Sequence, residues 1–227
     1  MRAVCLDMDG TLVDSERLWD VAVDELAAHM GRPLDAATRQ ATLGASLDGF
    51  FRILGEYTGH PVDGAEFERL SRMLHDRVTG LMETDLTWRP GARELLDALA
   101  EAGTPLALVT NTAADVARVP LSFLGRERFD VVVTGDAVAH AKPAPDPYLV
   151  ACERLGVAPG ESVAVEDSVT GASSAVAAGC RVLYVPSLAG QSDVPGAVRH
   201  EAGLEGLDPA GLDRLTAGAG AAAPVGE

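Results

Sequence analysis

The sequence of 227 residues predicts an α/β protein in which a helical unit is inserted into a parallel sheet. Short apolar runs alternate, in the later part of the chain, with segments of helical periodicity, a pattern typical of a parallel sheet covered on both faces. Roughly a hundred residues without a convincing strand separate the first run from the second, far more than an ordinary crossover needs. They therefore indicate an insertion. The apolar runs are residues 3–6, 106–109, 131–133, 163–165 and 182–185.

The insertion is predicted to span residues 15–88, which leaves 1–14 and 89–214 for the sheet domain. Two helices are expected in it, and their apolar stripes need each other as packing partners. The first stripe is Leu18, Ala22, Leu26 and Met30, and the second is Phe67, Leu70, Leu74, Val78 and Leu81. Trp88 to Gly91 mark the return to the sheet domain. Residues 215–227 are rich in small side chains and are predicted to form a disordered tail.

Charge and cysteine content restrict the partners and the compartment. Lys and Arg number 18 against 34 Asp and Glu, a net charge of −16, which predicts neither a nucleic acid nor a membrane partner. No obligate protein partner is inferred. Cys5, Cys152 and Cys180 fit neither a disulfide framework nor a zinc site. Together with an N-terminal apolar run too short for a signal peptide, they predict a cytoplasmic protein.

Polar side chains follow three of the predicted strands. Asp7 ends the first apolar run, Thr110 and Asn111 end the second, and Glu166 and Asp167 end the fourth. The carboxyl ends of parallel strands share one edge, where open α/β sheets bind ligands. Any one of these groups alone is typical of an ordinary strand exit into water. Two acidic clusters with a Thr-Asn pair between them favour a site.

The segment DMDGTL places Asp7 and Asp9 one residue apart, and Gly10 lets the backbone turn sharply. Two close carboxylates, completed by Asp167 with or without Glu166, form the oxygen-rich site that Mg²⁺ prefers, with water and a substrate phosphate in the remaining positions. A bound Mg²⁺ would keep Asp7 ionised and able to attack phosphorus. Nucleophilic catalysis is therefore predicted.

Lys142, in AKPAPDPY, is the single lysine of the chain, in which every other basic side chain except histidine is arginine. An ammonium is a compact charge that suits phosphate oxygens and a nearby carboxylate. A lone lysine in a turn is more often merely solvated, but Lys142 follows the third apolar run and so belongs to the same sheet edge. This placement favours a role in the site.

DMDGTL, VTN, AKPAPDPY and VEDS, in this order, resemble the four motifs of the haloacid dehalogenase superfamily. The likeness runs from about residue 2 to 185 and is to the phosphatase and phosphomutase branch, which has a Rossmann-like sheet core and an inserted α-helical cap. It implies that Asp7 is the nucleophile and Asp9 the general acid and base. Phosphate would be held by Thr110, the Asn111 backbone and Lys142. Asp7, the Asp9 carbonyl, Asp167 and Glu166 would hold Mg²⁺.

The resemblance also separates branches of the superfamily. Its dehalogenases lack a second acid at the position of Asp9, which favours phosphate chemistry here. In β-phosphoglucomutase a His stands at the position of Trp19 and an Arg at that of Leu47, and both are missing in this chain. The segment TLGASLDG, residues 42–49, resembles a substrate-contacting loop, although a plain helix connection fits it equally well. The candidate cap contacts are Trp19, Leu43, Gly44 and Leu47.

The sequence thus predicts an Mg²⁺-dependent phosphatase of a small phosphorylated metabolite, such as a sugar phosphate or a phosphoglycolate-like acid, acting through an aspartyl-phosphate. A β-phosphoglucomutase-like phosphomutase is the alternative within the same chemistry. From another class, a phospho-accepting signalling module also combines acids, a Thr and a Lys at one sheet edge, but such modules lack the DGT turn and the long helical insert.

Overall fold

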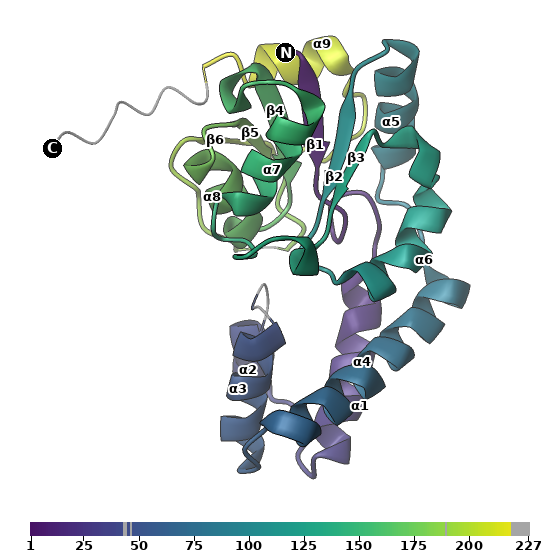
Figure 1. Ribbon diagram of the computed structural model, residues 1–227, viewed down its shortest axis with the longest axis vertical. Coiled ribbons are helices and arrows are strands. Elements are labelled where there is room, and N and C mark those ends of the chain that lie inside the picture. Colours follow the sequence, from purple (N-terminus) through teal and green to yellow (C-terminus); the bar gives the residue numbers. More distant parts are fainter. Residues whose placement is uncertain (43–44, 46, 189, 219–227) are drawn as a thin grey trace, which may run out of the picture. The chain divides into compact units, whose positions relative to one another are not determined.

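The computed structural model describes residues 1–42, 45, 47–188 and 190–218. Within them lies one sheet of six parallel strands in the order β3-β2-β1-β4-β5-β6 (Figure 1). The α/β fold with a parallel, Rossmann-like sheet is thereby confirmed. The strands are β1 (Ala3–Leu6), β2 (Leu106–Val109), β3 (Val131–Val133), β4 (Ser162–Glu166), β5 (Arg181–Tyr184) and β6 (Ala197–Arg199).

Helices cover the sheet because its central strands are apolar on both faces. Every residue of β1 is fully buried. Helices α7 and α8 pack on one face, where small side chains such as Cys5 and Ala164 let them come close. The helices of this unit are α5 (Ala92–Glu101), α6 (Ala114–Leu124), α7 (Asp146–Leu155), α8 (Val169–Ala177) and α9 (Pro209–Leu215), with 3-10 turns at Arg126–Arg128, Gly135–Ala137 and Pro159–Glu161.

Two elements near the carboxyl end escaped the sequence analysis. The edge strand β6 consists of three half-buried residues, one of them an arginine. The sequence therefore has no apolar run at this position from which the strand could be predicted. α9 is a short helix that starts at Pro209, where Asp208 accepts a hydrogen bond from the Gly211 amide at 2.6 Å. A cap of this kind stabilises a helix whose own residues show little periodicity.

The predicted start of a disordered tail at residue 215 is wrong. Leu215 belongs to α9, and Thr216 is fully buried. The Thr216 hydroxyl donates to the Leu212 carbonyl at 2.7 Å, and Arg181 binds the Thr216 carbonyl at 3.1 Å. These contacts fix the segment although its side chains are small. Residues 219–227 of the predicted tail lie outside the described part of the chain.

The helical insertion forms a compact unit of its own, Ser15–Leu86. Helices α1 and α4 carry the two predicted stripes and pack against each other, with Met82 rather than Leu81 fully buried. The stripes did not predict α2 and α3. Its helices are α1 (Glu16–His29), α2 (Ala36–Thr42), α3 (Leu47–Thr58) and α4 (Gly64–Asp85).

The sheet unit comprises the residues up to Asp14 and those from Thr87 onward, so the chain returns two residues earlier than residue 89. The Asp14 amide donates to the Thr87 carbonyl at 2.9 Å, and Val13 pairs with Trp88 in an antiparallel bridge. Because the segments that enter and leave the helical unit are paired with each other, Thr87 and Trp88 belong to the sheet unit.

Among the described residues, every helix is too short or too polar to span a lipid bilayer.

Candidate active site

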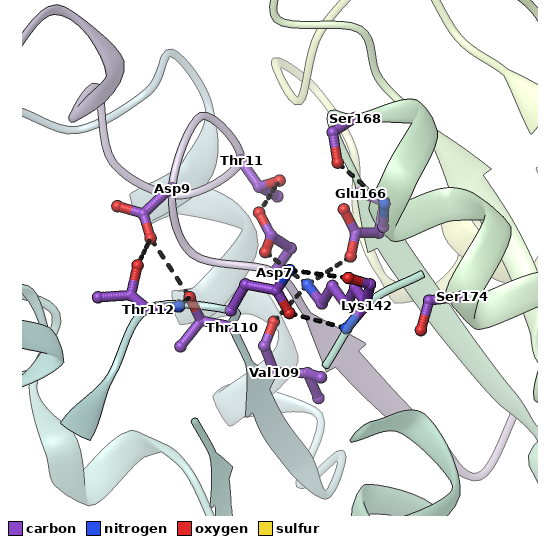
Figure 2. A network of polar contacts seen from close by, with 12 residues as sticks. Asp7, Asp9, Thr11, Val109, Thr110, Thr112, Lys142, Glu166, Ser168 and Ser174 are labelled. Carbon is purple, nitrogen blue, oxygen red and sulfur yellow. Dashed lines mark hydrogen bonds and ion pairs between the residues drawn. The ribbon is translucent and has the colours of Figure 1, made fainter. Parts of the chain in front are cut away.

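The polar residues that end β1, β2 and β4 lie at one edge of the sheet (Figure 2). The register explains why: Leu6 of β1 pairs with both Leu108 of β2 and Val165 of β4, so all three strands end at the same level. Asp7 and Asp167 follow β1 and β4, and Glu166 is the last residue of β4. The structure therefore brings together the residues that the sequence analysis placed at this edge.

Lys142 is the centre of a buried group that we call the lysine network: Lys142, Asp7, Glu166 and Tyr148. Its Nζ donates to Asp7 Oδ1 at 2.7 Å, to Glu166 Oε1 at 2.6 Å and to the Val109 carbonyl at 2.8 Å. An ammonium has three protons, and each has an acceptor here. Burial opposes the charge of Lys142, but the carboxylates of Asp7 and Glu166 outweigh it and hold the pKa of Lys142 above its usual value. Lys142 is therefore a fixed cation.

The side chain of Asn111 holds the backbone of Lys142. Asn111 Nδ2 donates to the Lys142 carbonyl at 3.1 Å, and the Lys142 amide donates to Asn111 Oδ1 at 2.9 Å. This pair of bonds fixes the loop that delivers the lysine to the strand ends. From the sequence, only the backbone of Asn111 was expected to have a role, in binding phosphate, and that role stays a prediction.

Asp7 is held through both carboxylate oxygens. Oδ1 accepts from Lys142, and Oδ2 accepts from the Thr11 hydroxyl at 2.8 Å. The Asp7 side chain is 9% exposed. Thr11 was not singled out in the sequence, although it belongs to the DMDGTL segment. A carboxylate with both oxygens fixed and a small exposed fraction is well oriented for attack on a substrate.

Glu166 combines full burial with an incompletely bonded carboxylate. Oε1 accepts from Lys142 and from the Tyr148 hydroxyl, whereas Oε2 has no hydrogen-bond partner among the described residues. Burial raises the pKa of Glu166, the charge of Asp7 raises it further, and Lys142 and Tyr148 offset this only in part, so that it reaches about 7. Burial, and then the charge of Glu166, raise the pKa of Tyr148 well above its usual value, so Tyr148 keeps its proton and donates it.

Asp7, Glu166 and Asp167 each offer an oxygen within 4.8 Å of the others, and all three residues are buried. When ionised they carry more negative charge than Lys142 can balance. Glycines keep the space around them open: a Cβ on Gly10 would lie 2.1 Å from Asp167 Oδ2, and one on Gly171 would lie 1.9 Å from Glu166 Oε2. An oxygen-only, buried and negatively charged set with one carboxylate oxygen unbonded fits a hard divalent cation such as Mg²⁺.

Asp9 lies apart from this cluster, among hydroxyl groups. Its Oδ2 accepts from the Thr112 hydroxyl at 2.7 Å and from the Thr110 hydroxyl at 3.3 Å. Thr110 Oγ1 in turn accepts from the Thr112 amide at 3.0 Å. We call Asp9, Thr110 and Thr112 the threonine group. Thr112 was missed in the sequence, where the available signal was a second hydroxyl two residues after Thr110. The Asp9 carbonyl stays a prediction as a metal ligand.

The predicted cap contacts belong to the helical unit. Trp19 lies in α1 and Leu47 begins α3, and both side chains are half-buried. Leu43 and Gly44 lie outside the described residues. The role of all four in substrate binding stays a prediction.

Comparisons with known proteins show which family this chain is similar to. The family model described as haloacid dehalogenase-like hydrolase matches residues 1–179. Hexitol phosphatase A of Escherichia coli (strain K12) is 36% identical over 79% of this chain and 80% of its own length. A phosphoglycolate phosphatase of Nitrosospira multiformis is 33% identical over 82% of this chain and 83% of its own.

Among solved structures, that of CbbY from Rhodobacter sphaeroides in complex with phosphate superposes with a TM-score of 0.84 at 32% identity, covering 94% of this chain and 99% of that one. A variant of the same protein in complex with xylulose-(1,5)bisphosphate gives a TM-score of 0.82 at 31% identity, covering 93% of this chain and 99% of that one.

Proposed function

Since the chain belongs to the haloacid dehalogenase-like hydrolases and is a phosphoric monoester hydrolase of their phosphatase branch, we propose that it hydrolyses small phosphorylated metabolites through a phosphorylated Asp7. The observation that carries the proposal is that two carboxylates of the site have different surroundings. Asp7 is fixed beside the only lysine, and Asp9 is held by hydroxyls. Membership of a hydrolase family leaves no ground for the signalling-module alternative.

In the first step an oxygen of Asp7 attacks phosphorus. The bond between phosphorus and the ester oxygen breaks, and its electron pair stays on the leaving oxygen, which takes a proton from the Asp9 carboxyl. In the second step water attacks the phosphorus of phosphorylated Asp7 and gives a proton to Asp9. The bond between phosphorus and Asp7 then breaks, so that alcohol and inorganic phosphate are the products and both carboxyl groups are restored.

The neighbours of Asp7 supply orientation and charge. Lys142 holds one oxygen of Asp7 and balances part of the charge that a phosphate brings. Thr110 and the Asn111 backbone are proposed to donate to phosphate oxygens, as the family motif implies. Asp7, Asp167, Glu166 and the Asp9 carbonyl would hold Mg²⁺. When bound, Mg²⁺ reduces the repulsion between the phosphate and the Asp7 carboxylate.

The substrate class is proposed from the relatives. Hexitol phosphatase A and phosphoglycolate phosphatase act on small phosphate monoesters, and CbbY is described in complex with a sugar bisphosphate. The helical unit, residues 15–86, is proposed as the cap that selects among such substrates, with Trp19 and Leu47 as candidate contacts. Location in the cytoplasm stays a prediction from the cysteine content.

The test is phosphate release from a panel of hexitol, sugar and small-acid phosphates, with Mg²⁺ and with EDTA. Turnover is expected only with Mg²⁺, and Asp7→Asn should abolish it. Glu153→Gln, an exposed carboxylate of α7, is the matched control and should behave as the wild type. Turnover that survives Asp7→Asn, or no turnover on any ester, would contradict the proposal.

The phosphomutase alternative predicts a different product. A sugar 1-phosphate would be converted into its 6-phosphate isomer faster than inorganic phosphate is released. Phosphorus NMR of the reaction mixture distinguishes the two outcomes. We expect inorganic phosphate, because this chain has Leu47 at the position where β-phosphoglucomutase has an arginine.

A further inference from the structure

The hydrogen bonds of Asp9 determine which of its oxygens carries a proton. Oδ2 accepts from both Thr112 and Thr110, and in Figure 2 the other carboxylate oxygen points away from both threonines. In a protonated carboxyl group the oxygen that accepts hydrogen bonds is the carbonyl oxygen, and the other oxygen carries the proton. A hydroxyl that donates to Oδ2 therefore favours protonation of Asp9 on Oδ1, which is turned away from the threonines.

The two threonines are not equivalent once phosphate is bound. A hydroxyl has a single proton, and that of Thr110 is directed at Asp9 over 3.3 Å, while its lone pair accepts from the Thr112 amide. If Thr110 donates to a phosphate oxygen, as the proposed function requires, its bond to Asp9 is lost. Thr112, at 2.7 Å, is then the hydroxyl that still holds Asp9 Oδ2.

We propose that Thr112 is a positioning residue that holds Asp9 by Oδ2, so that the proton for the leaving group is carried by Oδ1. The proposal rests on the proposed function, in which Asp9 is the general acid. Thr112 acts through Asp9 and is assigned no contact with the reacting atoms. Its position in the chain suits this role, because it lies in the short loop between β2 and α6 that also carries Thr110.

Thr112→Val tests the role of the Thr112 hydroxyl alone. Valine keeps the shape of the side chain but removes the hydroxyl, and the backbone amide that binds Thr110 Oγ1 remains. Thr112→Ser restores a hydroxyl. Thr104→Val, before the opposite end of β2, is the matched control for a threonine replaced by valine. Thermal melting checks that each variant folds, and Thr112→Ala replaces Thr112→Val if the latter does not.

The measurement is the single-turnover rate of alcohol release, with Mg²⁺, for two leaving groups. One substrate is the alkyl phosphate that is hydrolysed fastest in the panel, whose alkoxide needs a proton to leave. The other is 4-nitrophenyl phosphate, whose phenolate leaves with little protonation. General acid catalysis contributes roughly 10²–10⁴-fold, so Asp9→Asn should slow the alkyl phosphate by that factor and the aryl phosphate far less.

For Thr112→Val we expect a loss of about 10- to 100-fold on the alkyl phosphate, no more than the lower bound of the roughly 10²–10⁴-fold that a general acid supplies, because Asp9 itself remains. The loss on 4-nitrophenyl phosphate should be at least about tenfold smaller, with KM changed by less than about twofold and with recovery in Thr112→Ser. Equal losses on both substrates, or a raised KM with an unchanged rate, would overturn the role of Thr112.

The failure of this inference differs from the failure of the proposed function. If Asp9→Asn loses equally on both leaving groups, Asp9 is not the general acid and the proposed function itself is wrong in that step. If Asp9→Asn shows the dependence on the leaving group and Thr112→Val does not, only the role of Thr112 is wrong.

Discussion

The lysine network and the threonine group stand at the same sheet edge but hold their carboxylates by different means. Asp7 and Glu166 are buried and bonded to a cation, Lys142. Asp9 is half-buried, and the donors that the structure gives to its Oδ2 are neutral hydroxyls. Asp7, the proposed nucleophile, has to stay in place, and the bond from Lys142 supports this. Asp9, the proposed general acid, has to change its charge in every cycle, and the hydroxyls that donate to its Oδ2 carry no charge that would oppose the change.

Loss of the cation is expected to have the largest effect. Lys142→Met removes the partner of two buried carboxylates, and a buried charge left unpaired costs about 3–5 kcal/mol. Urea unfolding in EDTA should show this loss, together with loss of phosphatase activity. Lys142→Arg should not restore activity, because a planar guanidinium cannot place three protons on the three acceptors that Nζ reaches. An unchanged free energy of unfolding in Lys142→Met would remove the contrast between the two groups.

The threonine group should matter for catalysis and little for folding. Asp9→Asn is expected to lower kcat on alkyl phosphates by roughly 10²–10⁴-fold. Its free energy of unfolding should change by less than about 1 kcal/mol, because an amide oxygen can still accept from the Thr112 hydroxyl. Steady-state kinetics and urea unfolding of the same preparation measure both quantities. A destabilisation as large as that of Lys142→Met would show that the two groups are alike.

Magnesium should act on the clustered carboxylates of Asp7, Glu166 and Asp167 and not on the hydroxyls of the threonine group. Mg²⁺ at a hundred times its Kd would raise the free energy of unfolding by about 2.7 kcal/mol, since it binds only the folded chain. Asp167→Asn removes one of the three clustered carboxylates and should reduce this gain, whereas Thr112→Val should retain it. Thermal melting in Mg²⁺ and in EDTA measures the difference. An equal gain in wild type and Asp167→Asn would place the cation elsewhere.

The pH dependence of the metal-free protein should report Glu166. Its pKa is raised from 4.5 to about 7 in the folded state, so folding takes up a proton there. The stability contributed by this group is fully present below pH 4.5 and is lost as the pH rises through about 7. Between pH 5 and 8 the loss is on the order of 2 kcal/mol. Urea unfolding in EDTA should show a weaker fall in Glu166→Gln.

Much of the fold could be predicted from the sequence. Five of the six strands coincide with apolar runs to within one residue at each end, because a buried parallel strand needs apolar side chains on both faces. The edge strand β6 and the short helix α9 could not be predicted, since exposed or capped elements of three to seven residues leave no periodic signal.

The candidate site divides in the same way. Five residues could be placed at this edge of the sheet from the sequence, because each follows or ends an apolar run and parallel strands end at one edge. They are Asp7, Thr110, Lys142, Glu166 and Asp167. The apolar run that precedes each residue can be seen in the sequence itself, and the shared edge is a general property of parallel sheets. Asn111 was assigned through its backbone, and the clamp of its side chain on Lys142 was not foreseen.

The sequence alone determined the parallel sheet, the inserted helical unit and the identity of the charged groups at the strand ends, because hydrophobic periodicity and strand direction are encoded locally. Only the tertiary structure decided which hydroxyl holds which carboxylate: Thr11 on Asp7, Tyr148 on Glu166 and Thr112 on Asp9. Two of these contacts join residues that are far apart in the sequence, as Asp9 and Thr112 are, and they form only when folding brings the two side chains within hydrogen-bond distance. Hydroxyl side chains are also too common in turns for the sequence to show which of them makes such a contact.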